Sequence, residues 1–130
     1  MPFLLYDYRN GRGLNEIKIW IASLQKTERV KLDYKLDMLH MHGVELFPNT
    51  LSATTEPGIL KLRIHGGVQL RPLLCVGPVE IDREFTLLLG AKEVGSVLYP
   101  KRAEQQAVNR KGEVTLDPAN RRVLSERYAG

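Results

Sequence analysis

The sequence predicts an α+β fold: a small antiparallel β-sheet flanked by an N-terminal helical hairpin and a C-terminal helix. Three observations predict it. Apolar residues recur at helical spacing between residues 15 and 42. Between residues 59 and 90, short apolar stretches are separated by turn residues, as in strands. From residue 100 onward, prolines and apolar residues again stand where helices begin and pack. A chain of 130 residues fits a single domain, residues 1–130.

The first predicted elements are a strand and two helices. "PFLLYDY" predicts a strand over Phe3–Tyr8 that ends at the turn residues "NGRG". A helical hairpin follows from about Asn15 to His42, with its joint at residues 25–27 and a stop at Gly43. We expect its apolar stripes to face the core. They comprise Leu14, Ile17, Trp20, Ile21 and Leu24 in the first helix, and Val30, Tyr34, Met38 and Met41 in the second.

The predicted sheet lies in the middle of the chain. "GVELFPNTLSATTEPG", with its prolines and Ser/Thr cluster, predicts a loop before the sheet. Three antiparallel strands then follow within residues 59–90. In "LKLRIH", apolar side chains alternate with cationic ones, so one face of this strand meets the core and the other meets water. Pro72 lacks a backbone N–H, so the second strand is expected to be bulged or edge-like there. The third strand ends at Gly90.

The tail predicts two helices. Pro100 can occupy the first position of one helix, whose apolar side is formed by Ala103, Ala107 and Val108. "DPANRR" then predicts a short last helix, because an aspartate can cap its start and a proline fits its first turn.

Composition excludes several classes of protein. No apolar run approaches the ~20 residues of a membrane span, and the apolar start is too short for a signal peptide. The single cysteine, Cys75, excludes a disulfide scaffold and favours the reducing cytoplasm. We expect Cys75 to be a buried structural thiol rather than a nucleophile.

The positive charge is concentrated in one segment. Residues 61–111 hold nine Lys/Arg and five Asp/Glu, so they carry the whole net charge of +4. The segment begins with "LKLRIHGGVQLRPLL", which places Lys61, Arg63, His65 and Arg71 within eleven residues. This concentration favours a polyanion or an acidic protein as the binding partner.

Several stretches together resemble a known family. They are the helix end and loop "MLHMHGVELFPNTL", the hairpin "GILKLRIHGGVQLRPLLCV", the strand "FTLLLGAKE" and the closing "AEQQAVNRKGEV" with "DPANRR". In order and spacing they resemble the RelE/HigB superfamily of toxins from bacterial type II toxin–antitoxin pairs, in particular its phage-derived branch. The resemblance covers nearly the whole chain.

The resemblance implies a RelE-like fold and a function. The expected activity is metal-free endonucleolytic cleavage of mRNA on the translating ribosome, without a cofactor or metal site. A helix-turn-helix antitoxin is the expected protein partner. Residue by residue, the implied positions are the strand arginines Arg63 and Arg71, the basic residues Lys61 and Lys92, and the tyrosine Tyr99. Lys101 and Arg102, which follow Tyr99 and Pro100, complete the candidate RNA-binding residues.

The residue types suit this chemistry. Guanidinium groups bind phosphate oxygens in a bidentate manner, and Arg63 and Arg71 on neighbouring strands could converge on one phosphate. Histidine titrates near neutral pH, so His65 is a candidate for proton transfer, with Tyr99 as the alternative acid or as a base-stacking residue. Two other functions remain open: a binding toxin that acts on DNA gyrase without cleaving RNA, and a degenerate phage protein that only binds a partner.

Overall fold

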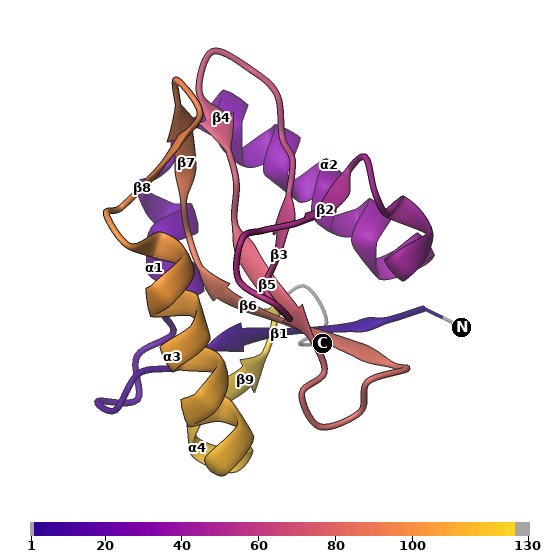
Figure 1. The fold of residues 1–130 in the computed structure, drawn as a ribbon, viewed down its shortest axis with the longest axis vertical. Helices are drawn as coiled ribbons and strands as arrows, with labels where there is room; N and C mark the ends of the chain where they lie inside the picture. The colour runs from indigo at the N-terminus through magenta and orange to yellow at the C-terminus, as the bar shows by residue number, and fades with distance from the viewer. Residues whose placement is uncertain (1, 127–130) are drawn as a thin grey trace.

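The computed structural model describes residues 2–126 and confirms the predicted α+β class (Figure 1). None of the helices in this range is long and apolar enough to cross a membrane. The helices are α1 (Glu16–Ser23), α2 (Lys26–His42), α3 (Ala103–Leu116) and α4 (Pro118–Arg121), with a 3-10 turn η1 (Gly43–Leu46) after α2. The strands are β1 (Leu4–Tyr8), β2 (Leu51–Ala53), β3 (Leu60–Leu62), β4 (Gln69–Leu70), β5 (Leu73–Val76), β6 (Glu84–Leu89), β7 (Lys92–Val94), β8 (Val97–Tyr99) and β9 (Arg122–Leu124).

Two sheets organise these strands. The larger has the order β2-β3-β5-β6-β1-β9, in which β1 and β6 run parallel and every other neighbouring pair is antiparallel. Between residues 59 and 90, β3, β5 and β6 follow one another as antiparallel neighbours. The smaller sheet has the order β4-β7-β8 and rises from the upper end of the molecule in Figure 1.

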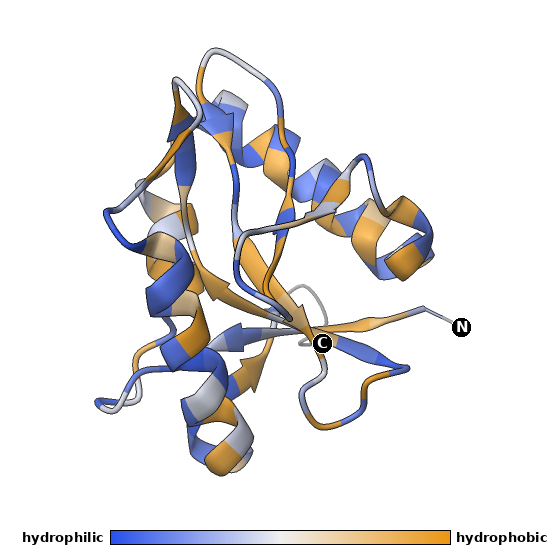
Figure 2. Ribbon diagram, viewed as in Figure 1, coloured by the Kyte–Doolittle hydropathy of each residue, from blue (hydrophilic) through white to orange (hydrophobic). Residues whose placement is uncertain are grey.

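Strand β6 lies in the centre of the core. All six of its residues are buried, and successive side chains of a strand point to opposite faces, so both faces of β6 are covered. Helix α1 packs near β6 and β1 on one side, and α3 packs near β6 and β5. Figure 2 shows the apolar residues gathered on β5 and β6, whereas the helices carry mixed surfaces.

Pro72 divides the second predicted strand, as its missing N–H predicts. Strand β4 ends at Leu70 and β5 begins at Leu73, so the two parts join different sheets. Arg71 stands at this division, and its backbone N–H donates to the carbonyl of Ala91 at 2.8 Å. The division turns the tip of the hairpin, residues 63–70, away from the main sheet and beside β7.

Helix α2 presents a different face to the core from the one predicted. Its buried residues are Leu32, Leu36 and Leu39, whereas Val30, Tyr34 and Met41 are 60%, 63% and 59% exposed. Both sets recur at helical spacing, and the leucines occupy the side that meets the sheet. The helix ends where expected, with Gly43 as its cap at a φ of 54°, a conformation that favours glycine.

Other predicted boundaries also change. The segment predicted as a loop, residues 43–58, contains η1 and the edge strand β2. Helix α3 begins at Ala103 rather than at Pro100, because residues 97–99 form β8 and pair with β7. The short last helix is present as α4, and the residues after it, Arg122–Leu124, add strand β9 beside β1.

Candidate functional site

A hollow lined by cationic side chains lies beside β3, and we call it the cation hollow. It measures about 290 Å³ and is lined by Lys35, Asn49, Thr50, Arg63 and His65. Lys35 comes from α2, Asn49 and Thr50 precede the edge strand β2, and Arg63 directly follows β3. The backbone N–H of Arg63 donates to the carbonyl of Thr50 at 2.8 Å, which holds the two segments together.

The cations of this hollow are not neutralised. Within residues 2–126, neither Arg63 nor Lys35 forms an ion pair with a carboxylate. The Nε atom of Arg63 is buried and has no hydrogen-bond partner. The Nζ atom of Lys35 lies 6.0 Å from the ring centroid of Tyr34. A buried guanidinium donor without an acceptor is costly, so this hollow is suited to an anion that would supply the acceptor.

Hydrogen bonds fix the orientation of the His65 ring. Its Nδ1 atom lies 3.1 Å from Oε1 of Gln69, and Nε2 of the same glutamine donates to the carbonyl of Gly66 at 3.3 Å. Because a carbonyl oxygen can only accept, the network assigns the proton of the neutral ring to Nδ1. The Nε2 atom of His65 therefore carries the lone pair and can accept a proton from a bound molecule.

Arg71 lies inside the protein and does not share an exposed surface with the nearby Arg63. It is 2% exposed, and its Nη1 donates to the carbonyls of Ile64 at 3.1 Å and Leu70 at 2.8 Å. Its Nη2 donates to Oε1 of Gln69 at 3.2 Å, the oxygen that also holds His65. The expected convergence of the two arginines on one phosphate is therefore not present, because β4 and β7 enclose the guanidinium of Arg71.

Glu93 neutralises two of the predicted cations. One of its carboxylate oxygens lies 3.6 Å from Nε of Arg71 and 3.9 Å from Nζ of Lys61. Burial lowers the pKa of the Arg71 guanidinium, Glu93 acts in the opposite direction, and the nearby Arg63 lowers it further. Lys61 and Arg71 thus form a mixed-charge cluster with Glu93, whereas Arg63 stays uncompensated.

The predicted residues Tyr99 and Lys92 meet in a second hollow, which we call the aromatic groove. It measures about 450 Å³, and its lining includes Trp20, Val68, Gly90, Lys92, Tyr99 and Pro100. Tyr99 does not line the cation hollow, so the structure separates it from His65. Lys101 and Arg102 are exposed and follow the groove residues directly in the chain, before α3 begins.

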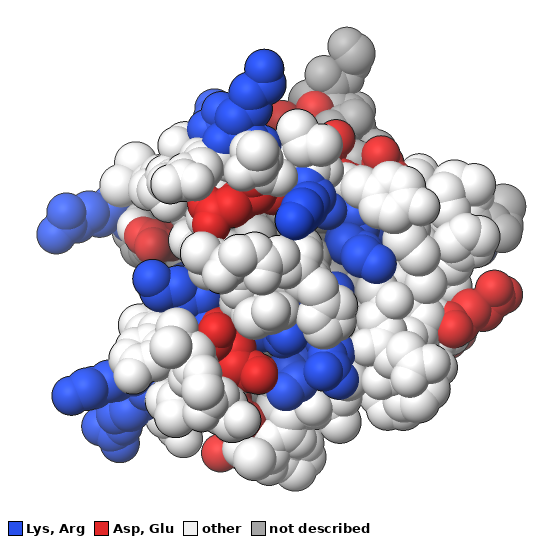
Figure 3. Space-filling view, turned by 90° about the horizontal axis from the view of Figure 1, so that it is seen from above, with Lys and Arg blue, Asp and Glu red and all other residues white. Residues whose placement is uncertain are grey.

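The end of the molecule that carries the β3–β4 hairpin is seen in Figure 3. Lysine and arginine side chains gather at several places on this face, with acidic side chains between them. The positive charge is therefore divided into separate clusters and does not form one uniform patch.

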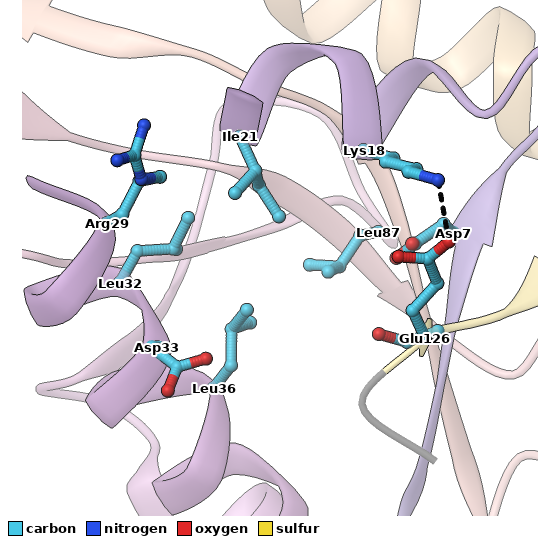
Figure 4. Close-up of a pocket in the computed structure, with 10 residues that line it drawn as sticks. Asp7, Lys18, Ile21, Arg29, Leu32, Asp33, Leu36, Leu87 and Glu126 are labelled. Carbon is cyan, nitrogen blue, oxygen red and sulfur yellow. Dashed lines mark hydrogen bonds and ion pairs between the residues drawn. The ribbon is translucent and has the colours of Figure 1, made fainter. Parts of the chain in front are cut away.

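A third hollow lies between α1, α2 and the sheet (Figure 4). It measures about 180 Å³, with an apolar wall formed by Ile21, Leu32, Leu36 and Leu87. The charged groups at its rim are engaged with protein atoms: Nζ of Lys18 lies 2.7 Å from Glu126, and Arg29 donates to the carbonyl of Leu24 at 2.8 Å. Its charged rim is thus already paired, in contrast to that of the cation hollow.

Cys75 is fully buried on β5, as predicted for a structural thiol. Burial raises the pKa of the Cys75 thiol to about 11. A neutral, enclosed thiol is a poor nucleophile. Cys75 is therefore part of the core and not of a catalytic site.

The sequence analysis missed three residues of these sites. Lys35 stands one helical turn after Lys31, a spacing that also suits a solvated face, so only the fold places it beside Arg63. Gln69 is two residues from Arg71 on the predicted strand, and that shared face was an available signal. Trp20 belonged to a predicted core stripe, and the structure shows it partly buried at the wall of the aromatic groove.

Comparisons with protein-family models, curated proteins and solved structures found no match to this chain.

Proposed function

We propose that this chain is a toxin that cleaves mRNA as a metal-free endoribonuclease, of the kind that its resemblance to the RelE/HigB superfamily implies. The observation that carries the proposal is the pairing of an uncompensated guanidinium with an oriented histidine in one hollow. Arg63 and Lys35 offer positive charge without carboxylate partners, and His65 offers a lone pair on Nε2. The proposal also includes a RelE-like fold for this chain and a helix-turn-helix antitoxin as its protein partner.

The proposed reaction is a transesterification within the RNA. Nε2 of His65 takes the proton of a ribose 2′-hydroxyl, and the 2′-oxygen then attacks the adjacent phosphorus. Arg63 and Lys35 hold the non-bridging oxygens while negative charge increases on them. The bond from phosphorus to the 5′-oxygen breaks, and a water molecule gives a proton to that oxygen while it takes the proton from Nε2 of His65, which returns the ring to its neutral form. The products are a 2′,3′-cyclic phosphate and a 5′-hydroxyl end.

Arg71 acts in this scheme as a positioning residue. Its guanidinium holds Oε1 of Gln69, and that oxygen orients His65. Lys61 on β3 lies 3.9 Å from Glu93 on β7 of the smaller sheet and is assigned to the RNA backbone, together with Lys101 and Arg102. These surface cations contribute to affinity rather than to the chemical step.

Primer extension on a defined message in a purified translation system, with and without ribosomes, tests the proposal. Wild-type protein should produce discrete cuts in the message. If cleavage depends on the ribosome, these cuts should appear only in the reactions that contain ribosomes. Arg63→Ala should lower the cleavage rate roughly 100- to 1,000-fold, and His65→Ala roughly 100-fold or more. His42→Ala is the matched control, because His42 is exposed at the end of α2 and does not line the hollow.

Two outcomes contradict the proposal. An intact message under both conditions rules out the nuclease. Cuts that persist unchanged in His65→Ala rule out His65 as the proton acceptor.

A specific observation supports a second candidate function, a toxin that acts by protein binding. The stripe of Val30, Tyr34 and Met41 on α2 is apolar, exposed and continuous with helical spacing. If the message stays intact, inhibition of DNA gyrase supercoiling by wild-type protein, and its loss in Tyr34→Asp, supports this alternative.

A further inference from the structure

A small hollow lies between the start of α2 and the tip of the hairpin that joins β3 to β4, and we call it the turn hollow. It measures about 110 Å³. Its lining comprises Gln25, Thr27, Glu28, Lys31, Gly66, Gly67 and Val68.

Each wall of the turn hollow continues a wall of the cation hollow. On α2, Lys31 stands four residues before Lys35, so the two lysines are neighbours on one face of the helix, with about 5–6 Å between their Cβ atoms. On the hairpin, Gly66 directly follows His65. The two hollows are therefore adjacent, and each contains one lysine of α2.

Lys31 lies over the hairpin turn without a partner for its charge. A Cβ atom at position 66 would lie 2.9 Å from Nζ of Lys31 and 3.6 Å from its Cδ atom, so the lysine occupies space that the lack of a side chain at Gly66 leaves open. Within residues 2–126, Lys31 forms no ion pair with a carboxylate and its ammonium group makes no hydrogen bond. Glu28 also lines the turn hollow, but its Oε1 accepts the backbone N–H of Gln25 at 2.8 Å.

The position of this ammonium group suits the substrate of the proposed nuclease. Single-stranded RNA carries a negative charge at every linkage, and proteins bind it with a series of cations that follow the backbone. Arg63 and Lys35 are assigned to the phosphate that is cleaved. Lys31 provides the next cation, one helical turn away on the same face of α2.

We propose that the turn hollow is a second phosphate-binding site, in which Lys31 holds the phosphate next to the scissile one. This inference rests on the proposed function, because it extends the path of the same RNA strand from the cation hollow to the tip of the hairpin. The site recognises charge and not sequence, since a lysine ammonium acts on phosphate as a point charge and phosphate contacts carry no base information.

Binding of short oligoribonucleotides tests this site. The probe is a dye-labelled trinucleotide whose 2′-hydroxyls are methylated, so that its two phosphodiester linkages are not cleaved, and fluorescence anisotropy measures its affinity for the whole chain. In Lys31→Ala, the slope of log affinity against log salt should become shallower by about 0.7, the contribution of one phosphate of a single strand. Binding should accordingly weaken roughly eightfold at 50 mM salt and roughly threefold at 200 mM.

Two further probes each carry one charge fewer. In each of them one linkage is an uncharged methylphosphonate, so a single charged phosphate remains. That phosphate should occupy the stronger site at Arg63 and Lys35, and Lys31→Ala should then bind these probes as the wild type does. An equally large loss with the singly charged probes overturns the second site, because the loss then reflects only the overall charge of the protein.

Lys26→Ala is the matched control for Lys31→Ala. Lys26 is an exposed lysine on α2 that lines neither hollow. Its removal should leave trinucleotide affinity within about twofold of the wild type, because salt screens an exposed charge that does not contact the strand.

Gly66 and Gly67 provide a second matched pair, in which the charge of Lys31 is kept. A Cβ atom at position 66 meets the ammonium group of Lys31, whereas one at position 67 meets no atom within 4 Å. Gly66→Ala should therefore displace the ammonium group and weaken trinucleotide binding. Gly67→Ala should bind the trinucleotide as the wild type does.

Three results overturn the inference. They are wild-type affinity in Lys31→Ala, an equal loss in Lys26→Ala, and equal affinities in the two glycine variants. Failure of the wild type to bind the trinucleotide overturns it as well.

The outcomes separate this inference from the proposed nuclease. Lys31-dependent binding together with an intact message supports the second phosphate site and rules out the nuclease. Normal cleavage of the message, with wild-type trinucleotide affinity in Lys31→Ala, has the opposite meaning: it supports the nuclease and overturns the second site.

Discussion

Arg71 and His65 share one acceptor, although they do not contact each other. Oε1 of Gln69 lies 3.2 Å from Nη2 of Arg71 and 3.1 Å from Nδ1 of His65. The buried arginine therefore influences the exposed histidine through the amide of a single glutamine. In the proposed nuclease, this relationship makes Arg71 a positioning residue that does not itself contact the RNA.

Removing Gln69 should change the His65 tautomer. In Gln69→Leu the acceptor for Nδ1–H is lost, so the ring can carry its proton on Nε2, which then no longer accepts one. We expect ¹⁵N NMR to report an Nδ1–H tautomer in the wild type and predominantly the Nε2–H form in the variant. Cleavage should fall roughly tenfold or more, since an oriented general base is lost. If the His65 tautomer is unchanged in Gln69→Leu, Gln69 does not determine which ring nitrogen carries the proton.

The two arginines of the hairpin should differ in their effect on stability. Arg71→Ala leaves the buried carbonyls of Ile64 and Leu70 without their donor, so we expect the free energy of unfolding to fall by about 2–4 kcal/mol. Arg63→Ala should change it by less than about 1 kcal/mol, because Arg63 is partly exposed and has no carboxylate partner. Urea denaturation measures both values. Equal losses in the two variants would contradict the assignment of Arg71 to the interior.

The two apolar stripes of α2 can be distinguished in the same way. Leu36 is 3% exposed, so Leu36→Ala should lower the free energy of unfolding by about 2–5 kcal/mol. Tyr34 is 63% exposed, and Tyr34→Ala should stay within about 0.5 kcal/mol of the wild type. Thermal denaturation of the two variants checks this pair. A large loss of unfolding free energy in Tyr34→Ala would mean that the exposed stripe of Val30, Tyr34 and Met41 is covered in solution.

These stripes also show what the sequence can and cannot determine. Helical spacing predicts that residues 26–42 form a helix, and the structure has one there. The spacing does not choose between Leu36 and Tyr34, because both recur with the same period. That choice depends on which side of α2 meets the sheet, and Leu87, which lines the same hollow as Leu36, lies more than forty residues away along the chain.

The same limit applies to the short strands and to Arg71. Strand β9 has three residues and exists through its pairing with β1, which no local pattern reveals. Alternation along the hairpin groups Lys61, Arg63 and Arg71 as cations of one sheet. Their separation depends on β7, which brings Glu93 to two of them and leaves the third at the cation hollow. Local patterns thus found the candidate residues, whereas long-range pairing decided their environments.

Cys75 should make stability depend on pH in the alkaline range. Burial raises the pKa of its thiol from 9.0 to about 11, so the folded state favours the neutral form. The corresponding stability is fully present below pH 9 and is lost as the pH rises towards 11, with a total of about 2–3 kcal/mol. In Cys75→Ala this part of the decline between pH 9 and 11 should disappear. Denaturant titrations at several pH values measure the free energy of unfolding. An equal decline between pH 9 and 11 in the wild type and in Cys75→Ala would contradict the prediction.

Gly90 and Gly112 form a matched pair of glycines with opposite surroundings. A Cβ at position 90 would collide with the ring of Trp20, whereas a Cβ at position 112 on α3 meets no atom within 4 Å. Gly90→Ala should therefore lower the free energy of unfolding by about 1–3 kcal/mol, because the indole must move. Gly112→Ala should raise it by about 0.5–1 kcal/mol, because alanine favours a helix interior. The fluorescence of Trp20 reports the displacement of its indole ring. The emission should shift in Gly90→Ala and stay unchanged in Gly112→Ala. Unaltered emission and stability in Gly90→Ala would mean that the indole does not lie on this glycine, and the wall of the aromatic groove would then need a different position.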